Sequence, residues 1–229
     1  MNQDYIFIHI PRTGGRSIEL KLHGSLNMVN HYTIQDHITE FTESEVENKF
    51  KFTTIRNPFD RVVSLWRMYV FQFYTPRPEN YVLSFDEWIR MRKNNIKNMD
   101  MSYQTQIDQM YYCKTRSGKV LIDKFLKFEN LQNDFDSIAG RFGITDTKLE
   151  KIGEFDKPIS EENARKFIES ELHQSVECSV ITHEDKNKIM ERLPKLIVNN
   201  YRDAYESQDS IDIVANMNRE VINRFNYHF

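Results

Sequence analysis

Two segments of the chain share one pattern, in which an apolar strand runs into a polar turn and then into a helix. The first covers residues 5–17 and reads YIFIHIPRTGGRS, and the second covers residues 52–64 and reads FTTIRNPFDRVVS. A turn of this kind presents backbone N–H groups at the start of a helix, where an anion binds well. Because both turns carry arginine and hydroxyl side chains, the pattern predicts a ligand with two separate anionic groups.

The alternation of strands and helices along the chain favours an α/β fold with a central, mostly parallel sheet flanked by helices. Apolar runs predict strands at residues 5–10, 50–55 and 120–128. Apolar spacing predicts helices at residues 16–22, 33–40, 43–48, 59–73, 85–93, 131–142, 161–172, 184–192 and 211–225. With 229 residues, of which 39% are hydrophobic, we expect one domain over residues 1–229.

The helix predicted at residues 59–73 has the clearest pattern, because its apolar positions follow helical spacing. Pro58 suits its first turn, where the missing N–H costs nothing. Arg56 lies on the turn before the helix, and Ser64 lies about two turns into it on the polar side. A phosphate lying along that side would reach both residues.

These residues resemble a known family. Residues 5–17 resemble the 5′-phosphosulfate loop of the sulfotransferases that use 3′-phosphoadenosine 5′-phosphosulfate (PAPS). Arg56 followed by Ser64 resembles their 3′-phosphate motif, and weaker similarities at residues 31–33, 128–131 and 225–229 are typical of the carbohydrate-type and bacterial branch. The resemblance implies a P-loop-like sulfotransferase fold. It also implies PAPS as cosubstrate, no metal, and a carbohydrate or other small-molecule hydroxyl as acceptor.

The resemblance also implies which residues bind PAPS. The 5′-phosphosulfate would be held by Arg12, Thr13, Gly14, Gly15, Arg16 and Ser17, and the 3′-phosphate by Arg56 and Ser64. The family has a lysine where this chain has Arg12. Arginine keeps its charge and offers a planar fork of donors, but it does not readily give up a proton. We therefore expect Arg12 to act electrostatically in catalysis, steadying the charge that develops on the leaving group.

His31 is the first candidate for the base that takes the acceptor proton, because histidine titrates near neutral pH. It lies between the two turns, where related sequences also place a histidine. His37, Asp36 and Glu40 remain alternatives, and His9 is expected to pack near the first turn.

Several other polar residues keep two interpretations. Arg61 either binds phosphate or pairs with Asp60 or Glu129, and Glu129 is expected to tie the third strand to the sheet. Gln104 and Gln106 either face the acceptor or belong to a polar loop.

Two other functions stay open beside sulfuryl transfer. A small-molecule kinase would need the pattern G-x-x-x-x-G-K-[ST], but Ile10 stands at its first glycine and Arg16 at its lysine. A catalytically weak nucleotide-binding relative is the second alternative, because Arg12 replaces the family's lysine.

Composition limits the partners and the location. The formal net charge of −3 gives no positive field to attract nucleic acid. No apolar segment reaches the ~20 residues that cross a membrane, and the chain opens without a signal peptide, so a cytoplasmic location is expected. Cys113 and Cys178 have no metal-ligand spacing and are expected to be reduced. The sequence leaves the oligomeric state unknown.

Overall fold

The structure, a computed structural model, describes residues 4–26, 30–72, 83–94, 106–152 and 200–229, with isolated positions between 162 and 198. Its contacts divide the chain into two compact units. The first consists of Met1–Arg61, Asp100–Ile152 and Met217–His228, and the second of Val62–Met99, Gly153–Asn216 and Phe229. Each unit is described by itself, and one domain over residues 1–229 stays a prediction.

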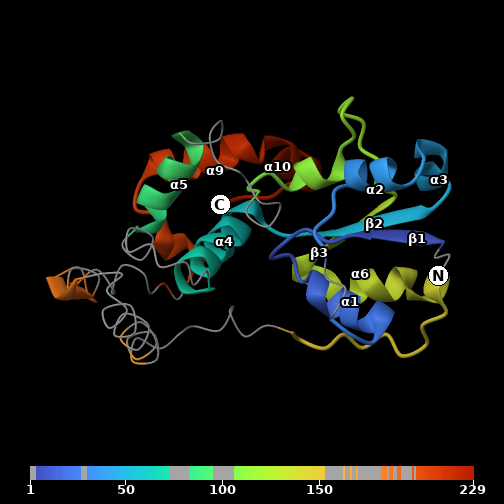
Figure 1. The fold of residues 1–229 in the computed structure, drawn as a ribbon, viewed down its shortest axis with the longest axis horizontal. Helices are drawn as coiled ribbons and strands as arrows, with labels where there is room; N and C mark the ends of the chain where they lie inside the picture. Colours follow the sequence, from blue (N-terminus) through green and yellow to red (C-terminus); the bar gives the residue numbers. More distant parts are fainter. Residues whose placement is uncertain are drawn as a thin grey trace. The chain divides into compact units, whose positions relative to one another are not determined.

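A parallel sheet forms the centre of the first unit (Figure 1). Its strands are β1 (Tyr5–Ile8), β2 (Phe50–Ile55) and β3 (Lys124–Lys127), and they lie in the order β1-β2-β3. Both neighbouring pairs are parallel. Parallel neighbours need crossover connections, and helices supply them here. The expected α/β fold with a mostly parallel sheet is therefore confirmed for the described residues, although β1 and β3 are shorter than predicted.

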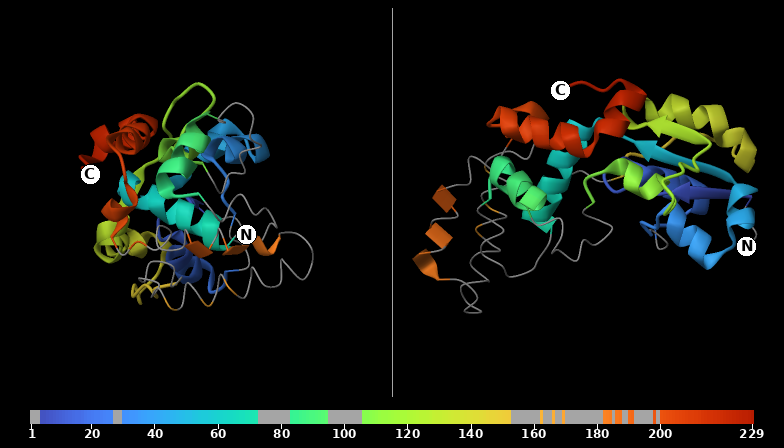
Figure 2. Two further views of the ribbon diagram at one scale, coloured as in Figure 1. Left: turned by 90° about the vertical axis from the view of Figure 1, so that its left-hand side faces the viewer. Right: turned by 90° about the horizontal axis from the view of Figure 1, so that it is seen from above.

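Helices cover both faces of this sheet (Figures 1 and 2). On one face, α1 (Gly15–His23) and α6 (Leu131–Ala139) pack Ile18 and Phe135 around Phe52 of β2. On the other face, α2 (Ile34–Glu40), α3 (Glu43–Glu47) and α10 (Arg219–Phe225) pack against Ile6 and Ile8 of β1. The short helix η3 (Gln109–Cys113) joins this second cluster. Burial on both faces explains why these strands read as continuous apolar runs.

The single helix predicted at residues 211–225 is wrong. The structure has two helices there, α9 (Gln208–Met217) and α10, separated by Asn218. The backbone of Asn218 leaves the helical region, with φ −118° and ψ 22°, and its side chain is fully buried. Asparagine competes poorly for a helix interior and favours caps, so it ends one helix and begins the next. The helices predicted at residues 161–172 and 184–192 lie largely outside the described residues.

The second unit is helical in its described part. It contains α4 (Pro58–Gln72) from Val62 onward, α5 (Phe85–Asn94), the short helix η7 (Tyr201–Ala204) and most of α9. Buried aromatic rings connect these elements. Phe85 lies 5.8 Å from Trp66 of α4 and 4.6 Å from Tyr205, measured between ring centroids.

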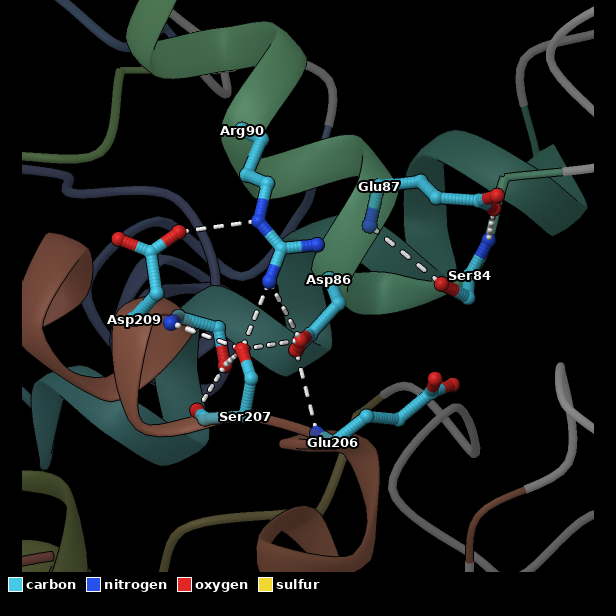
Figure 3. Close-up of polar contacts among 8 residues, drawn as sticks. Ser84, Asp86, Glu87, Arg90, Glu206, Ser207 and Asp209 are labelled. Atoms are coloured by element: carbon cyan, nitrogen blue, oxygen red, sulfur yellow. Dashed lines mark hydrogen bonds and ion pairs between the residues drawn. The ribbon is translucent and has the colours of Figure 1, made fainter.

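A polar network also joins α5 to the segment that precedes α9 (Figure 3). The buried carboxylate of Asp86 accepts hydrogen bonds from the backbone N–H of Glu206 at 3.1 Å and from the hydroxyl of Ser207. Arg90 donates to Asp86 at 3.1 Å, to Ser207 at 2.8 Å and to Asp209 at 2.9 Å. The buried charge is thus compensated within its own unit.

Candidate active site

The two polar turns meet at one edge of the sheet because β1 and β2 are parallel neighbours. Ile8, the last residue of β1, pairs with Thr53 of β2, so both strands send their chains out of the same edge. The hydroxyl of Thr53 donates to the carbonyl oxygen of Ile8 at 2.7 Å. Ligand sites of parallel α/β sheets form at this carboxyl edge.

The first turn has a strained backbone where it enters α1. Arg12 adopts a φ of 66° and Gly14 a φ of 83°, both in the left-handed region. Glycine takes this conformation at no steric cost, whereas arginine does not, and such strain is found at ligand sites. The hydroxyl of Thr13 donates to the carbonyl of Ile10 at 2.7 Å and contacts the hydroxyl of Thr54. The Thr13 side chain therefore shapes the turn and does not point its hydrogen at a ligand.

The N-terminus of α1 suits an anion. Its N-cap residue, Gly14, makes no side-chain cap hydrogen bond, and the first turn holds no acidic residue. In contrast, α2 and α3 both begin with capping boxes, built from Thr33 with Asp36 and from Thr42 with Glu45. The Ser17 amide already donates to the carbonyl oxygen of Gly14 at 3.1 Å, so an anion at the start of α1 would meet the amides before it, with no side-chain cap to displace.

His9 forms the floor beneath this turn. Its side chain is buried, and a Cβ added to Gly15 would lie 2.2 Å from the imidazole Cδ2. Only glycine lets the backbone come this close. Burial, with Arg16 nearby, lowers the pKa of His9 to about 3, so the ring is neutral. The sequence prediction that His9 packs near the first turn is confirmed.

The second turn is anchored to the first by Arg56. The buried Arg56 side chain donates from Nε to Asp60 Oδ2 at 2.8 Å and from Nη1 to the carbonyl oxygen of Arg12 at 3.3 Å. Its guanidinium carbon lies 4.3 Å above the centre of the Phe128 ring. The Phe128 ring stacks on the face of the guanidinium and Asp60 accepts hydrogen bonds at its edge, which together fix its plane.

Side chains distant in the sequence hold the backbone of the second turn. The amide side chain of Gln109 accepts from the N–H of Arg56 at 3.0 Å and donates to its carbonyl at 2.9 Å. Glu129 accepts from the N–H of Asn57 at 2.6 Å and from the hydroxyl of Tyr227 at 2.9 Å. Glu129 therefore ties the second turn to the C-terminal segment. Sequence reasoning missed Gln109, because no local pattern marks it.

Of the two roles predicted for Arg61, the ion pair with Asp60 or Glu129 is not formed in the described residues, and binding of a phosphate stays a prediction. Its side chain is fully buried and donates to the carbonyl oxygens of Pro11 at 2.8 Å, Ile107 at 2.8 Å and Gln106 at 2.9 Å. Asp60 pairs instead with Arg56. Burial lowers the pKa of Arg61 to about 10, so it stays charged at neutral pH. Arg61 therefore fastens the first turn to the segment before η3.

Gln106 also has a structural use, since its Oε1 accepts from the N–H of Ile107 at 2.9 Å. Gln104 lies outside the described residues.

His31 is half-buried beside His9. Its Nδ1 lies 2.9 Å from the carbonyl oxygen of His9, and the two rings meet edge-on with centroids 4.6 Å apart. A carbonyl only accepts, so Nδ1 carries the hydrogen and Nε2 keeps its lone pair. Burial, with His9 as the next cause, lowers the pKa of His31 to about 4. The imidazole is thus neutral and oriented, but the expectation that it titrates near neutral pH is wrong, because burial makes it a weaker proton acceptor.

The remaining predicted ligands are distributed over both units. Arg16 is exposed and Ser17 is buried, both in the first turn of α1. Ser64 is buried in the stretch of α4 that belongs to the second unit, and its part in binding stays a prediction. Within the described residues, no group of three or more His, Cys, Asp or Glu side chains is arranged to hold a metal ion. Cys113 is buried and free, and Cys178 lies outside these residues.

The comparison with protein families decides the identity. A sequence model of the sulfotransferase family matches residues 9–210, a stretch that includes both turns. The chain belongs to the sulfotransferase family. The predicted resemblance is therefore confirmed at the level of the family, and this sulfotransferase is a transferase with sulfuryl transfer as its general activity. No curated protein and no solved structure matches it significantly. Among the helices in the described part, none has the length and apolar character required to span a bilayer.

Proposed function

We propose that this sulfotransferase moves a sulfuryl group from PAPS to a hydroxyl of a carbohydrate or other small-molecule acceptor. The observation that carries the proposal is the hydrogen bond from Arg56 Nη1 to the carbonyl oxygen of Arg12. It brings the two basic turns together at one sheet edge, which suits a nucleotide with anionic groups at both its 5′ and 3′ ends.

The donor would be held by residues of both turns. In this proposal, the 5′-phosphosulfate lies at the N-terminus of α1, against the backbone of Thr13 to Ser17, and the side chain of Arg56 with that of Ser64 takes the 3′-phosphate. The start of α1 supports the first assignment, because an anion there meets the positive end of the helix dipole and displaces no side-chain cap. The P-loop-like fold of the family belongs to the same proposal.

In this proposal two side chains, those of His31 and Arg12, assist the sulfuryl transfer. The acceptor oxygen forms a bond to sulfur while the bond from sulfur to the bridging phosphate oxygen breaks, and 3′-phosphoadenosine 5′-phosphate leaves. His31 takes the acceptor proton on Nε2, and its Nδ1–H stays bonded to His9. Arg12 stabilises the negative charge that develops on the departing phosphate. No step requires Arg12 to lose its proton.

Two binding measurements and one transfer assay test this proposal. Calorimetry should show uptake of 3′-phosphoadenosine 5′-phosphate and weaker binding of ATP with magnesium, whereas a small-molecule kinase would reverse that order. Transfer of radiolabelled sulfate from PAPS to a panel of carbohydrate and phenolic hydroxyls should then give product. Binding without transfer to any acceptor would favour the catalytically weak relative, which the replacement of lysine by Arg12 makes the second candidate.

A further inference from the structure

The buried residue His9 contacts both the first turn, where the phosphosulfate is proposed to bind, and His31, the proposed base. Below the first turn it lies against Gly15, so closely that an added Cβ would be 2.2 Å from Cδ2 and 2.4 Å from Nε2. On its other side it meets the ring of His31 edge-on at 4.6 Å, and its backbone carbonyl accepts from His31 Nδ1. We propose that His9 is a positioning residue that sets the height of the phosphosulfate turn and the environment of the base.

The contact with Gly15 is steric and not conformational. The backbone of Gly15 lies outside the left-handed region, so alanine meets no backbone penalty there. The three atoms nearest to an added Cβ all belong to the imidazole of His9. The two positions are therefore coupled, because shortening residue 9 should make room for a larger residue 15.

The contact with His31 acts through burial. His9 lies over His31 and keeps water from it, and the charged groups that also act on His31 are Glu19 of α1 and Arg61 of α4. Around His9 itself stand Glu19, with Oε1 3.5 Å from Nδ1, and Arg16. His9 Nδ1 is buried and makes no hydrogen bond with the described residues. The ring thus contributes shape and exclusion of water, and it does not relay a proton.

This inference rests on the proposed function, because that function makes Gly15 part of the donor site and His31 the base. Its first test needs no ligand. Histidine NMR titration should find the pKa of His31 near 4 in the parent protein. His9→Ala should raise it by at least about one unit, because the change admits water and removes a neighbouring group. In His9→Asn, which keeps the atoms nearest the backbone, the pKa of His31 should lie between its values in the parent and in His9→Ala. This variant replaces His9→Ala in the test if His9→Ala does not fold. A His31 pKa unchanged in a folded variant would overturn the proposal.

A double-mutant cycle tests the contact with Gly15. Gly15→Ala should lower the thermal unfolding midpoint and weaken binding of 3′-phosphoadenosine 5′-phosphate at least tenfold. The pair His9→Ala with Gly15→Ala should recover part of both losses. Gly140→Ala is the matched control, because a Cβ there meets nothing within 4 Å. A double variant no better than Gly15→Ala would refute the steric coupling.

The two proposals fail in different ways. A parent protein that does not bind the bisphosphate would end the donor assignment, while the His31 titration and the unfolding cycle would still decide the role of His9.

Discussion

The carbonyl oxygen of Arg12 accepts a hydrogen bond from Nη1 of Arg56 over 3.3 Å, although the two residues are 44 positions apart. This contact joins the two turns at the edge of the sheet. It also means that a change at Arg56 affects the shape of the first turn as well as the charge of the second.

Removing the Arg56 side chain should weaken binding of 3′-phosphoadenosine 5′-phosphate by ~1.5–3 kcal/mol, because a charge-assisted hydrogen bond to phosphate is lost. Isothermal calorimetry measures this directly. Asp60→Asn is the matched control, since it weakens the pairing with Arg56 and leaves the arginine charge in place. It should bind the bisphosphate at least as well as the parent. Equal affinity in Arg56→Ala and the parent would remove the 3′-phosphate assignment.

Replacing Arg12 by alanine should lower turnover far more than nucleotide affinity, because its charge is required where the leaving group develops charge. Both residues carry a Cβ, so the left-handed backbone at φ 66° costs alanine as much as arginine. Arg12→Lys, which restores the family's residue and the charge, should recover turnover. Steady-state rates beside calorimetric affinities make the comparison, and a fully active Arg12→Ala variant would dismiss the catalytic role.

Arg61→Met should destabilise the protein by roughly 3 kcal/mol or more, because three carbonyl oxygens lose their donors in the interior. The stability of Arg61→Lys should lie between those of the parent protein and Arg61→Met, since an ammonium group lacks the planar fork of donors. Urea unfolding measures the free energies. The control is Arg116→Met, where the side chain is exposed and the backbone N–H makes the hydrogen bond to Gln35. Similar stability in all three variants would contradict the fastening role.

Acid should destabilise the folded protein well above the pH at which its carboxylates titrate. The pKa of His9 is lowered to about 3 and that of His31 to about 4, from 6.5. Below pH 6.5 these two histidines therefore bind protons in the unfolded chain but stay neutral in the folded chain. The free energy of unfolding falls as a result. Each histidine accounts for about 2 kcal/mol between pH 7 and pH 5.

Glu19 opposes this trend, because burial raises its pKa and folding then favours the protonated form. Urea unfolding at pH 7 and pH 5 measures the net effect. His9→Asn should lose less stability on acidification than the parent, by at least the contribution of His9, because the variant also raises the pKa of His31. An equal loss of stability on acidification in the parent and in His9→Asn would contradict the burial of the His9 ring.

Asp86→Asn should cost about 2–4 kcal/mol of stability, because Arg90 and Ser207 lose the buried carboxylate that accepts their hydrogen bonds. Asp209→Asn, at an exposed position, should change stability by less than about 1 kcal/mol. Neither substitution should alter affinity for the bisphosphate. Equal losses at the two positions would show that burial does not set the strength of this network.

Much of the local structure follows from the sequence. The strand at residues 50–55 and the helices that follow the two turns are marked by apolar spacing, Pro58 and the paired glycines. The break at Asn218 was missed, because apolar residues continue with helical spacing on both sides of it. Short-range signals predict such elements well and predict their ends poorly.

The partners of the site residues depend on contacts between distant parts of the chain. Nothing near Arg61 in the sequence indicates that three carbonyls would take its donors. The sequence predicted that His9 packs near the first turn, but not that its ring would lie against Gly15. Gln109 and Glu129 hold the second turn from 53 and 72 positions away.

By itself, the sequence determined that two basic turns would each follow a strand and precede a helix, since that pattern is local and each residue's preference contributes to it. Only the tertiary structure decided that both turns leave the same sheet edge, that the hydroxyl of Thr13 meets that of Thr54, and that Arg56 reaches Arg12. The physical reason is that parallel pairing of β1 with β2 sets which distant atoms become neighbours, and hydrogen bonds form only where donor and acceptor meet.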